Sequence, residues 1–220
     1  MPNQTIRAVL WDFGGVITES PFEAFRRFEV ERGLPRDFIR TVNTINPDTN
    51  AWALYERSQI TLDQFDRAFE AESRAAGHAV RGADIALLLY GAIRPVMVQA
   101  LQRCKVHFKN ACLTNNVITK TPHGLPASAD RAMQVIEVMR LFDHVIESSK
   151  IGARKPEPRF YDIALQRIGV GAKQAVFLDD LGINLKPARA LGMTTIKVID
   201  PDAALQELEH ILGIPLRTPE

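Results

Sequence analysis

Residues 8–18 read Ala-Val-Leu-Trp-Asp-Phe-Gly-Gly-Val-Ile-Thr, and no other stretch constrains the fold as strongly. The first four residues are apolar, as in a short buried strand, and Asp12 follows them directly. Gly14 and Gly15 then allow the backbone to turn sharply. A carboxylate in this position is costly unless it binds a cation, accepts hydrogen bonds or reacts. We therefore predict that Asp12 is a nucleophile.

The overall composition is that of an ordinary globular chain, with 46% hydrophobic and 24% charged residues among 220. The 27 basic side chains nearly balance the 26 acidic ones, which leaves a formal charge of +1. Binding to nucleic acid or to an anionic membrane depends on a positive excess, so neither partner is expected. Cys104 and Cys112 lie in apolar surroundings without metal-ligand spacing, which favours core thiols in a reducing compartment.

The sequence also carries no signal for export or membrane insertion. No basic stretch followed by a signal-length apolar run is found at the N-terminus. The most apolar segment, residues 85–90, is too short to cross a bilayer. We therefore expect a soluble, cytoplasmic protein.

Residues 19–90 show the periodicity of helices and no convincing strand. One helix start is especially clear, because Thr61 and Gln64 have the spacing of a capping box. We expect this segment to be an all-helical cap inserted after the first strand. Residues 1–18 and 91–220 would then form an α/β core.

From residue 94 onward, apolar strand patterns alternate with helical patterns. Strands are predicted at residues 111–114, 144–147, 175–178 and 194–199, and helices at 95–104, 130–140, 160–168, 184–191 and 203–212. Strands separated by helices imply right-handed crossovers and a doubly wound parallel sheet. Ligands of such sheets bind beyond the C-terminal ends of the strands.

Four polar features fall at or near those strand ends, and each is unremarkable alone. A single aspartate can be a turn residue, and the other three features can be ordinary surface loops. Their predicted convergence on one edge of one sheet is what points to chemistry. The four features are Asp12, Thr114-Asn115-Asn116, Lys155-Pro156-Glu157 and Asp179-Asp180.

These side chains have the chemistry that phosphoryl transfer requires. A carboxylate nucleophile can form an aspartyl-phosphate and so divide one difficult hydrolysis into two steps. A hard cation is needed to offset the repulsion between Asp12 and an anionic phosphate. Oxygen ligands from Asp12 and Asp179, with Asp180 directly or through water, match the octahedral preference of Mg²⁺.

The remaining polar groups suit the transferred phosphoryl group itself. Thr114 and Asn115 supply hydroxyl and amide donors for its oxygens. Lys155 can neutralise the charge that develops on these oxygens and is therefore predicted to be both catalytic and phosphate-binding. The substrate expected from this set is a small phosphorylated metabolite.

In chain order, Asp-Phe-Gly-Gly-Val, Leu-Thr-Asn-Asn, Arg-Lys-Pro-Glu and Phe-Leu-Asp-Asp-Leu-Gly resemble the four motifs of the haloacid dehalogenase-like hydrolase superfamily. The helical insert and the phrase Ala-Val-Phe-Leu-Asp-Asp-Leu-Gly-Ile-Asn are similar to one branch in particular. That branch contains the phosphatase domain of soluble epoxide hydrolase and the hydrolase-like domain fused to some acyl-CoA dehydrogenases. The resemblance implies a Rossmann-like core, Mg²⁺, Asp12 as nucleophile, Thr114 as phosphate binder, Lys155 as the charge-stabilising lysine, and Asp179 as metal ligand with Asp180 beside it.

One position departs from the pattern of the phosphatases in this superfamily. They usually carry a second aspartate two residues after the nucleophile, as general acid and base, whereas this chain has Gly14. The resemblance still implies that the Gly14 carbonyl ligates Mg²⁺. General acid–base catalysis contributes about 10²–10⁴-fold, so slow turnover is predicted unless another group supplies the proton. Glu19, Glu23 and His123 are candidates for that group.

Three other functions were compared with the phosphatase. A receiver domain has its acidic pair on the first strand and its phosphorylated aspartate later, the reverse of this order. A dehalogenase uses a similar nucleophile without metal, and Asp179-Asp180 argues against it, since paired carboxylates make sense mainly around a cation. A binding or regulatory protein without turnover remains the serious alternative because of Gly14.

Substrate selection is expected in the helical insert and in the loop spanning residues 116–129. Trp52, Tyr55 and Arg57 could face a ligand, although aromatic residues at helical spacing more often pack a core. The sequence leaves the oligomeric state open.

Overall fold

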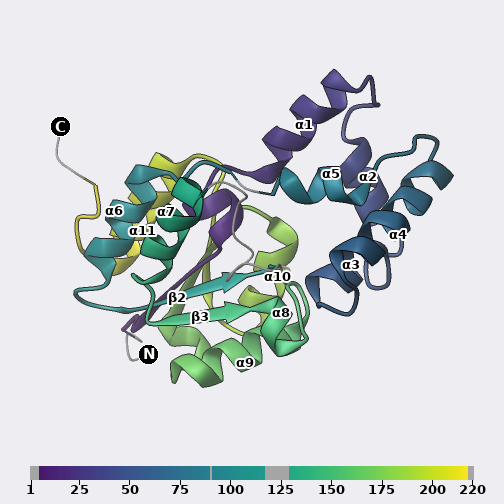
Figure 1. Ribbon diagram of the computed structural model, residues 1–220. Helices are drawn as coiled ribbons and strands as arrows, with labels where there is room; N and C mark the ends of the chain where they lie inside the picture. The colour runs from purple at the N-terminus through teal and green to yellow at the C-terminus, as the bar shows by residue number, and fades with distance from the viewer. Residues whose placement is uncertain (1–4, 90, 117–128, 218–220) are drawn as a thin grey trace.

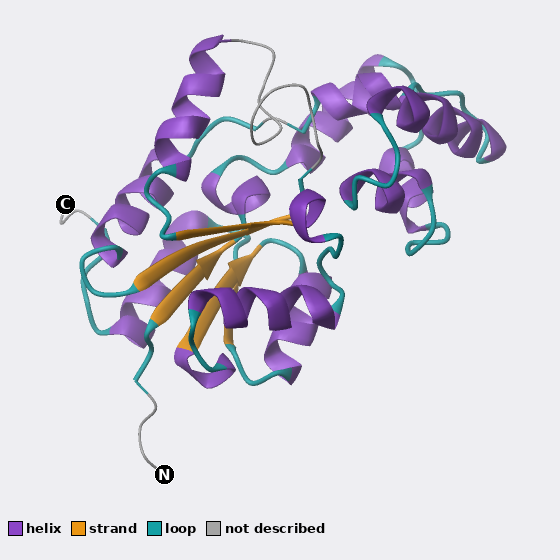
Figure 2. Ribbon diagram, turned by 60° about the horizontal axis from the view of Figure 1, so that its bottom comes forward, coloured by secondary structure: helices purple, strands orange, loops and turns teal. Residues whose placement is uncertain are grey.

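Strand β1 (Ala8–Trp11) lies at the centre of a parallel sheet that has five strands in the described part of the chain. The computed structural model describes residues 5–89, 91–116 and 129–217, with side chains omitted for 129–132. The strand order is β3-β2-β1-β4-β5. Figure 2 shows the strands side by side, with helices around them. The other strands are β2 (Lys109–Thr114), β3 (His144–Glu147), β4 (Ala175–Asp179) and β5 (Thr194–Lys197).

Helices cover both faces of the sheet (Figure 1). Strand β1 is fully buried and contributes side chains to each face. Val9 and Trp11 pack with apolar residues of α6, α7 and α11, whereas Ala8 and Leu10 pack with those of α9 and α10. This two-sided burial explains the uninterrupted apolar run before Asp12. The bounds are α6 (Pro95–Cys104), α7 (Ala129–Met139), α8 (Ser148–Ile151), α9 (Pro158–Ile168), α10 (Gly182–Ala190) and α11 (Pro201–Leu212), with a 3₁₀ turn at Ala172–Gln174.

Residues 19–90, called the insert below, contribute five helices among the residues described. These helices have an apolar core of their own, in which the Tyr55 ring stacks on Phe65 at 4.5 Å between centroids. Figure 1 shows them gathered to one side of the sheet and its covering helices. The bounds are α1 (Pro21–Glu31), α2 (Phe38–Thr44), α3 (Ala51–Glu56), α4 (Leu62–Ala75) and α5 (Gly82–Leu87).

The insert leaves and rejoins the rest of the chain through two adjacent segments. Thr18 and Ile93 form an antiparallel bridge, and Glu19 N donates to Ala92 O at 2.8 Å. A Cβ on Gly91 would lie 2.2 Å from the Glu19 carbonyl oxygen, so only glycine allows this close approach. The two connecting segments are therefore bonded to each other where the insert joins the core.

The predicted fold class is confirmed: the core is α/β, with a parallel sheet between helical layers. The capping box is confirmed as well, since Gln64 N donates to Thr61 Oγ1 and Thr61 N donates to Gln64 Oε1. Helix α8 was not predicted, because four residues are too few to show a period. Helix α9 begins two residues before its predicted start, with Pro158 in its first turn.

Two smaller expectations also bear on the described residues. Cys104 and Cys112 are free and buried, as predicted for core thiols, and burial raises the pKa of Cys104 to about 12. Among the described residues, no helix combines the length and the apolar character that a membrane span needs.

Candidate active site

Backbone pairing places Asp12 beside Asp179. Trp11 is paired with Leu178, and the Asp12 N–H donates to the Leu178 carbonyl at 2.9 Å. Asp12 and Asp179 each come one residue later, so the same parallel register aligns them at the C-terminal edge of the sheet. Both are buried, with 7% and 0% of their surface exposed.

Lys155 joins these two carboxylates from the loop before α9. Its Nζ lies 2.8 Å from Asp12 Oδ1 and 2.8 Å from Asp179 Oδ2, and its side chain is only 1% exposed. Burial lowers the pKa of the Lys155 ammonium, but the attraction of Asp12 and Asp179 outweighs it and raises that pKa above the ordinary range. Lys155 is therefore a fixed positive charge at neutral pH.

Asp180 completes a cluster of three carboxylates. One oxygen from each of Asp12, Asp179 and Asp180 lies within 4.8 Å of the others. Burial raises the pKa of Asp12 well above its usual range, with Asp179 and Asp180 adding to the effect. Burial and the neighbouring Asp179 raise the pKa of Asp180 to about 6. The raised pKa values of Asp12 and Asp180 indicate more carboxylate than the single ammonium of Lys155 neutralises, so a divalent cation with oxygen ligands fits the cluster.

The two glycines after Asp12 are not equivalent. The chain turns through Phe13–Ile17, and Gly15 has a φ of +80°. A Cβ on Gly15 would lie 2.2 Å from Asp180 Oδ2, whereas a Cβ on Gly14 would meet no atom within 4 Å. Arg94 Nη1 also donates to the Gly15 carbonyl at 3.0 Å. The turn therefore requires glycine at position 15 and has room for a side chain at position 14.

The carboxylate of Asp179 is occupied by donors from the protein. Its Oδ1 accepts from Leu181 N at 2.8 Å and from Asn184 Nδ2 at 3.0 Å. Its Oδ2 accepts from Lys155 Nζ at 2.8 Å and from the same Asn184 nitrogen at 3.1 Å. Asp180 Oδ2, in contrast, accepts from Ser20 Oγ at 3.1 Å. The donors around Asp179 orient it toward Lys155 and leave Asp180 as the more available metal ligand.

Thr114 and Asn115 end the neighbouring strand. Thr114 is the last residue of β2 and is 8% exposed. The Asn115 side chain holds the backbone of Lys155, because its Oδ1 accepts from Lys155 N at 2.9 Å and its Nδ2 donates to Lys155 O at 3.0 Å. That carboxamide therefore positions the lysine loop, and phosphate binding by Thr114 and Asn115 stays a prediction.

The other side chains singled out in the sequence fall into three groups. Trp52 and Tyr55 pack in the aromatic core of the insert, in edge contact and stacked on Phe65 respectively. Glu19 and Glu23 are exposed. His123 and the loop at 117–128 lie outside the described residues.

Sequence reasoning missed the polar residues that support the cluster. Asn184 is buried and contacts Asp179, and its place five residues after that aspartate is the one available signal. Ser20 precedes the proline that begins α1, a usual capping position, yet its hydroxyl contacts Asp180 instead of capping the helix. Glu56 is buried in the insert, and its Oε2 lies 2.5 Å from Nε of Arg154 in the core. No sequence pattern indicates this contact.

The comparisons with known proteins agree with this geometry. The profile of the haloacid dehalogenase-like hydrolases matches residues 6–192. Mouse acyl-CoA dehydrogenase family member 10 is 35% identical over 97% of this chain, and pig bifunctional epoxide hydrolase 2 is 32% identical over 96%. The chain spans only 20% and 40% of the lengths of these two relatives. A phosphatase of Mycobacterium tuberculosis is 32% identical over 86% of this chain and 85% of its own length.

Solved structures share the fold at lower identity. A Bacteroides thetaiotaomicron haloacid dehalogenase family enzyme, in complex with magnesium and inorganic phosphate, has a TM-score of 0.58 at 20% identity, covering 87% of this chain and 93% of its own. The L-2-haloacid dehalogenase of Xanthobacter autotrophicus has a TM-score of 0.61 at 17% identity, covering 97% and 85%. With the profile match over most of its length, the chain belongs to the haloacid dehalogenase-like hydrolase family.

Proposed function

We propose that this protein is a Mg²⁺-dependent phosphatase that hydrolyses a small phosphorylated metabolite through an aspartyl-phosphate on Asp12. The observation that carries the proposal is the placement of one buried ammonium, Lys155, 2.8 Å from Asp12 within a cluster of three carboxylates. Similarity to a bacterial phosphatase over 85% of that relative's length supports the same reaction class.

In the first step, a carboxylate oxygen of Asp12 forms a bond to phosphorus, and the bond from phosphorus to the alcohol oxygen of the substrate breaks. The leaving oxygen takes its proton from solvent, because residue 14 carries no acid. Asp12 Oδ1 already accepts from Phe13 N at 2.7 Å and pairs with Lys155. We therefore assign the attack to Oδ2. In the second step, a water oxygen forms a bond to phosphorus and gives a proton to solvent, and the bond from phosphorus to the Asp12 oxygen breaks, which releases phosphate and regenerates the Asp12 carboxylate.

Lys155 stays protonated through both steps and stabilises the negative charge on the phosphoryl oxygens. Thr114 and the main-chain amide of Asn115 complete the proposed phosphate site. Asp12, the Gly14 carbonyl, Asp180 and Asp179 would hold Mg²⁺, with Asp180 the more available of the two adjacent aspartates. Bound Mg²⁺ supplies charge neutralisation between the carboxylates and the phosphate.

The proposal assigns residues 19–90 to a cap domain and residues 1–18 and 91–220 to the catalytic core. The insert has a separate apolar core and two adjacent connections, as expected for a cap. Its helix α3 contacts the loop that carries Lys155, which brings the insert against the lysine of the carboxylate edge.

The test is hydrolysis of a chromogenic aryl phosphate with Mg²⁺, compared between wild type and Asp12→Asn. We expect turnover that EDTA abolishes and that the variant lowers by at least about 10³-fold, because the nucleophile is lost. Equal rates in the two proteins would overturn the proposal. Release of chloride from 2-chloropropionate without metal would assign the site to dehalogenation instead.

Gly14 favours a second candidate, a ligand-binding protein that has lost turnover. Nothing within 4 Å occupies the position where a side chain at residue 14 would begin. If slow chemistry reflects only the missing acid, Gly14→Asp should raise turnover of alkyl phosphates, which have poor leaving groups, by up to about 10²-fold. Tight phosphate binding without turnover, in wild type and in Gly14→Asp alike, would favour the binding function.

A further inference from the structure

We propose that Glu56 and Arg57, at the C-terminal end of α3 in the insert, are positioning residues for Lys155. Their contacts with the core fix the loop at residues 154–157 and so hold the Lys155 ammonium against Asp12. This inference rests on the proposed function only for the catalytic role of Lys155. It assigns to the insert a part in assembling the carboxylate edge.

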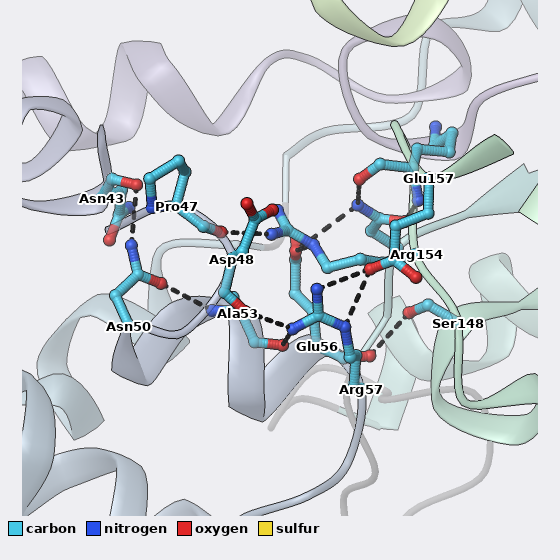
Figure 3. A network of polar contacts seen from close by, with 12 residues as sticks. Asn43, Pro47, Asp48, Asn50, Ala53, Glu56, Arg57, Ser148, Arg154 and Glu157 are labelled. Atoms are coloured by element: carbon cyan, nitrogen blue, oxygen red, sulfur yellow. Dashed lines mark hydrogen bonds and ion pairs between the residues drawn. The ribbon is translucent and has the colours of Figure 1, made fainter. Parts of the chain in front are cut away.

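Two ion pairs of opposite polarity join the end of α3 to residues on either side of Lys155 in the sequence. Figure 3 shows both pairs. Glu56 Oε2 lies 2.5 Å from Arg154 Nε, on one side of the lysine in the sequence. Arg57 Nη2 and Nε lie 2.6 and 2.8 Å from Glu157 Oε1, on its other side. Neighbouring residues of α3 thus bind both ends of one short loop, and reversing the polarity of either pair would produce repulsion.

The Glu56–Arg154 pair is well sheltered from solvent, and the Arg57–Glu157 pair is partly exposed on the Glu157 side. The side chains of Glu56 and Arg57 are 10% and 13% exposed, and those of Arg154 and Glu157 are 15% and 31% exposed. Shielding from water strengthens the Coulomb attraction in both pairs, and in the second pair it also strengthens the charge-assisted hydrogen bond from Arg57 Nε to Glu157. The contact is therefore well suited to fix the distance between the end of α3 and the loop that carries Lys155.

A direct chain of contacts leads from Glu56 to the lysine. Glu56 Oε2 also accepts from Asn115 Nδ2 at 3.4 Å, and Asn115 holds both backbone groups of Lys155. The Glu56 carbonyl accepts from Ser148 Oγ at 2.8 Å, and Ser148 Oγ accepts from Asn116 N at 3.0 Å. The end of α3 is thus tied to the turn after β2 as well as to the lysine loop.

The loop before α3 is held in the same way. Arg57 Nη1 donates to the Asp48 carbonyl at 2.8 Å, and Arg154 Nη1 donates to the Pro47 carbonyl at 3.1 Å (Figure 3). Arg154 therefore contacts the insert at two points, Glu56 and Pro47. Two points of contact restrict rotation of the insert about its connecting segments as well as separation from the core.

The placement of Lys155 has little tolerance, because its Nζ contacts two carboxylates at 2.8 Å at once. A displacement of about 1 Å in such a group can cost about 10²-fold in rate. None of the contacts described for Glu56 and Arg57 reaches Asp12, Asp179 or Asp180. Their effect on the reaction is therefore exerted through the loop.

The experiment uses Glu56→Gln, Arg57→Glu and the double variant Arg57→Glu with Glu157→Arg, in the full chain with Mg²⁺. The matched control is Arg81→Gln, which removes an ion pair of 2.7 Å to Asp66 within the insert. Amide hydrogen exchange is read in peptides covering 153–157 and 8–12, and kcat and KM are measured with an aryl phosphate.

We expect Glu56→Gln and Arg57→Glu to raise exchange in 153–157 about tenfold without changing 8–12. We also expect kcat to fall about tenfold while KM changes less than threefold, and the charge-reversed double variant to recover most of both losses. The Arg81→Gln control should match wild type in every measurement.

Unchanged exchange at 153–157 in both single variants, or an equal change in Arg81→Gln, would overturn the inference. So would a tenfold rise in exchange with kcat unaltered. If a single variant unfolds, shown by exchange throughout 8–12, Glu157→Gln on the core side of the same pair replaces it. If wild type lacks turnover, the proposed function fails, while the exchange measurements still decide whether α3 holds the lysine loop.

Discussion

The carboxylate edge and the contact made by α3 meet at Lys155, but they are held together in different ways. At the edge, parallel strand pairing places Asp12 next to Asp179, and the hydrogen-bonded backbones fix the spacing of the two residues. At the contact, long side chains such as Arg57 and Glu157 bridge two parts of the fold through ion pairs. The edge is a product of backbone register, and the contact is a product of side-chain charge.

The two regions also differ in burial, because the carboxylate edge is more deeply buried than the α3 contact. Asp179 is fully buried and accepts four contacts from three donors, whereas the Glu157 side chain is 31% exposed. Breaking a buried charge network leaves charges uncompensated, but a partly exposed pair can be replaced by water. We expect the carboxylate edge to determine whether the reaction can occur at all. The α3 contact would then adjust how well Lys155 is aligned with Asp12.

The largest expected effect is at the edge itself. Lys155→Met removes the ammonium and leaves Asp12, Asp179 and Asp180 without their positive partner. We expect the metal-free protein to lose about 3–5 kcal/mol of unfolding free energy, measured by urea denaturation in EDTA. Added Mg²⁺ should recover part of the loss, because it binds the folded carboxylates.

Lys197→Met is the control for this measurement, because Lys197 is exposed on the edge strand β5. It should change the unfolding free energy by less than about 0.5 kcal/mol. A similar loss in both variants would show that Lys155 does not neutralise the cluster.

The two neighbouring glycines provide a smaller test of the edge. Gly15→Ala should lower the unfolding free energy by about 2 kcal/mol, because a Cβ strains the positive φ and displaces the Asp180 carboxylate. Isothermal titration should show weakened Mg²⁺ binding in the same variant. Gly14→Ala should be neutral or slightly stabilising, since its backbone is ordinary and its surroundings are open. Equal losses at both positions would contradict the described turn.

The sequence predicted the carboxylate edge because that edge follows from a general rule. Parallel strands present their C-terminal ends together, so Asp12, Asp179 and Asp180 had to meet once the alternation of strands and helices was recognised. Lys155 could be anticipated for a related reason, since its loop precedes a helix on the same edge. The different requirements at Gly14 and Gly15 could not be predicted, because they depend on which of the two glycines approaches Asp180.

The α3 contact was beyond sequence reasoning. Arg57 and Glu157 are 100 residues apart, and their pairing depends on how the insert is oriented on the core. Arg57 was considered as a ligand contact, but its guanidinium is engaged by Glu157 and Asp48. The Asn115 carboxamide likewise holds the Lys155 backbone, a use that composition and spacing do not reveal.

The pH dependence of Mg²⁺ binding sharpens the comparison further. Burial raises the pKa of Asp180 to about 6, so in the metal-free protein this carboxyl is largely protonated below pH 6. Mg²⁺ requires the carboxylate, so binding releases the proton and the affinity rises with pH. Through this one group, calorimetry should show Kd falling about fivefold from pH 5 to pH 6 and about twofold more from pH 6 to pH 7. Asp180→Asn should weaken binding and flatten this dependence, whereas Arg57→Gln at the α3 contact should leave its slope unchanged.

The smallest expected effect concerns salt at the α3 contact. Raising NaCl from about 0.05 to about 0.5 M shortens the screening length, and a partly exposed pair such as Arg57–Glu157 weakens as a result. We expect amide exchange in residues 51–57 to rise about two- to fivefold, which corresponds to less than about 1 kcal/mol. Exchange at Leu10 should not respond, because strand β1 is fully buried and its position rests on backbone hydrogen bonds. An equal response in both segments would mean that the insert and the sheet open as one unit and would remove the distinction between the two regions.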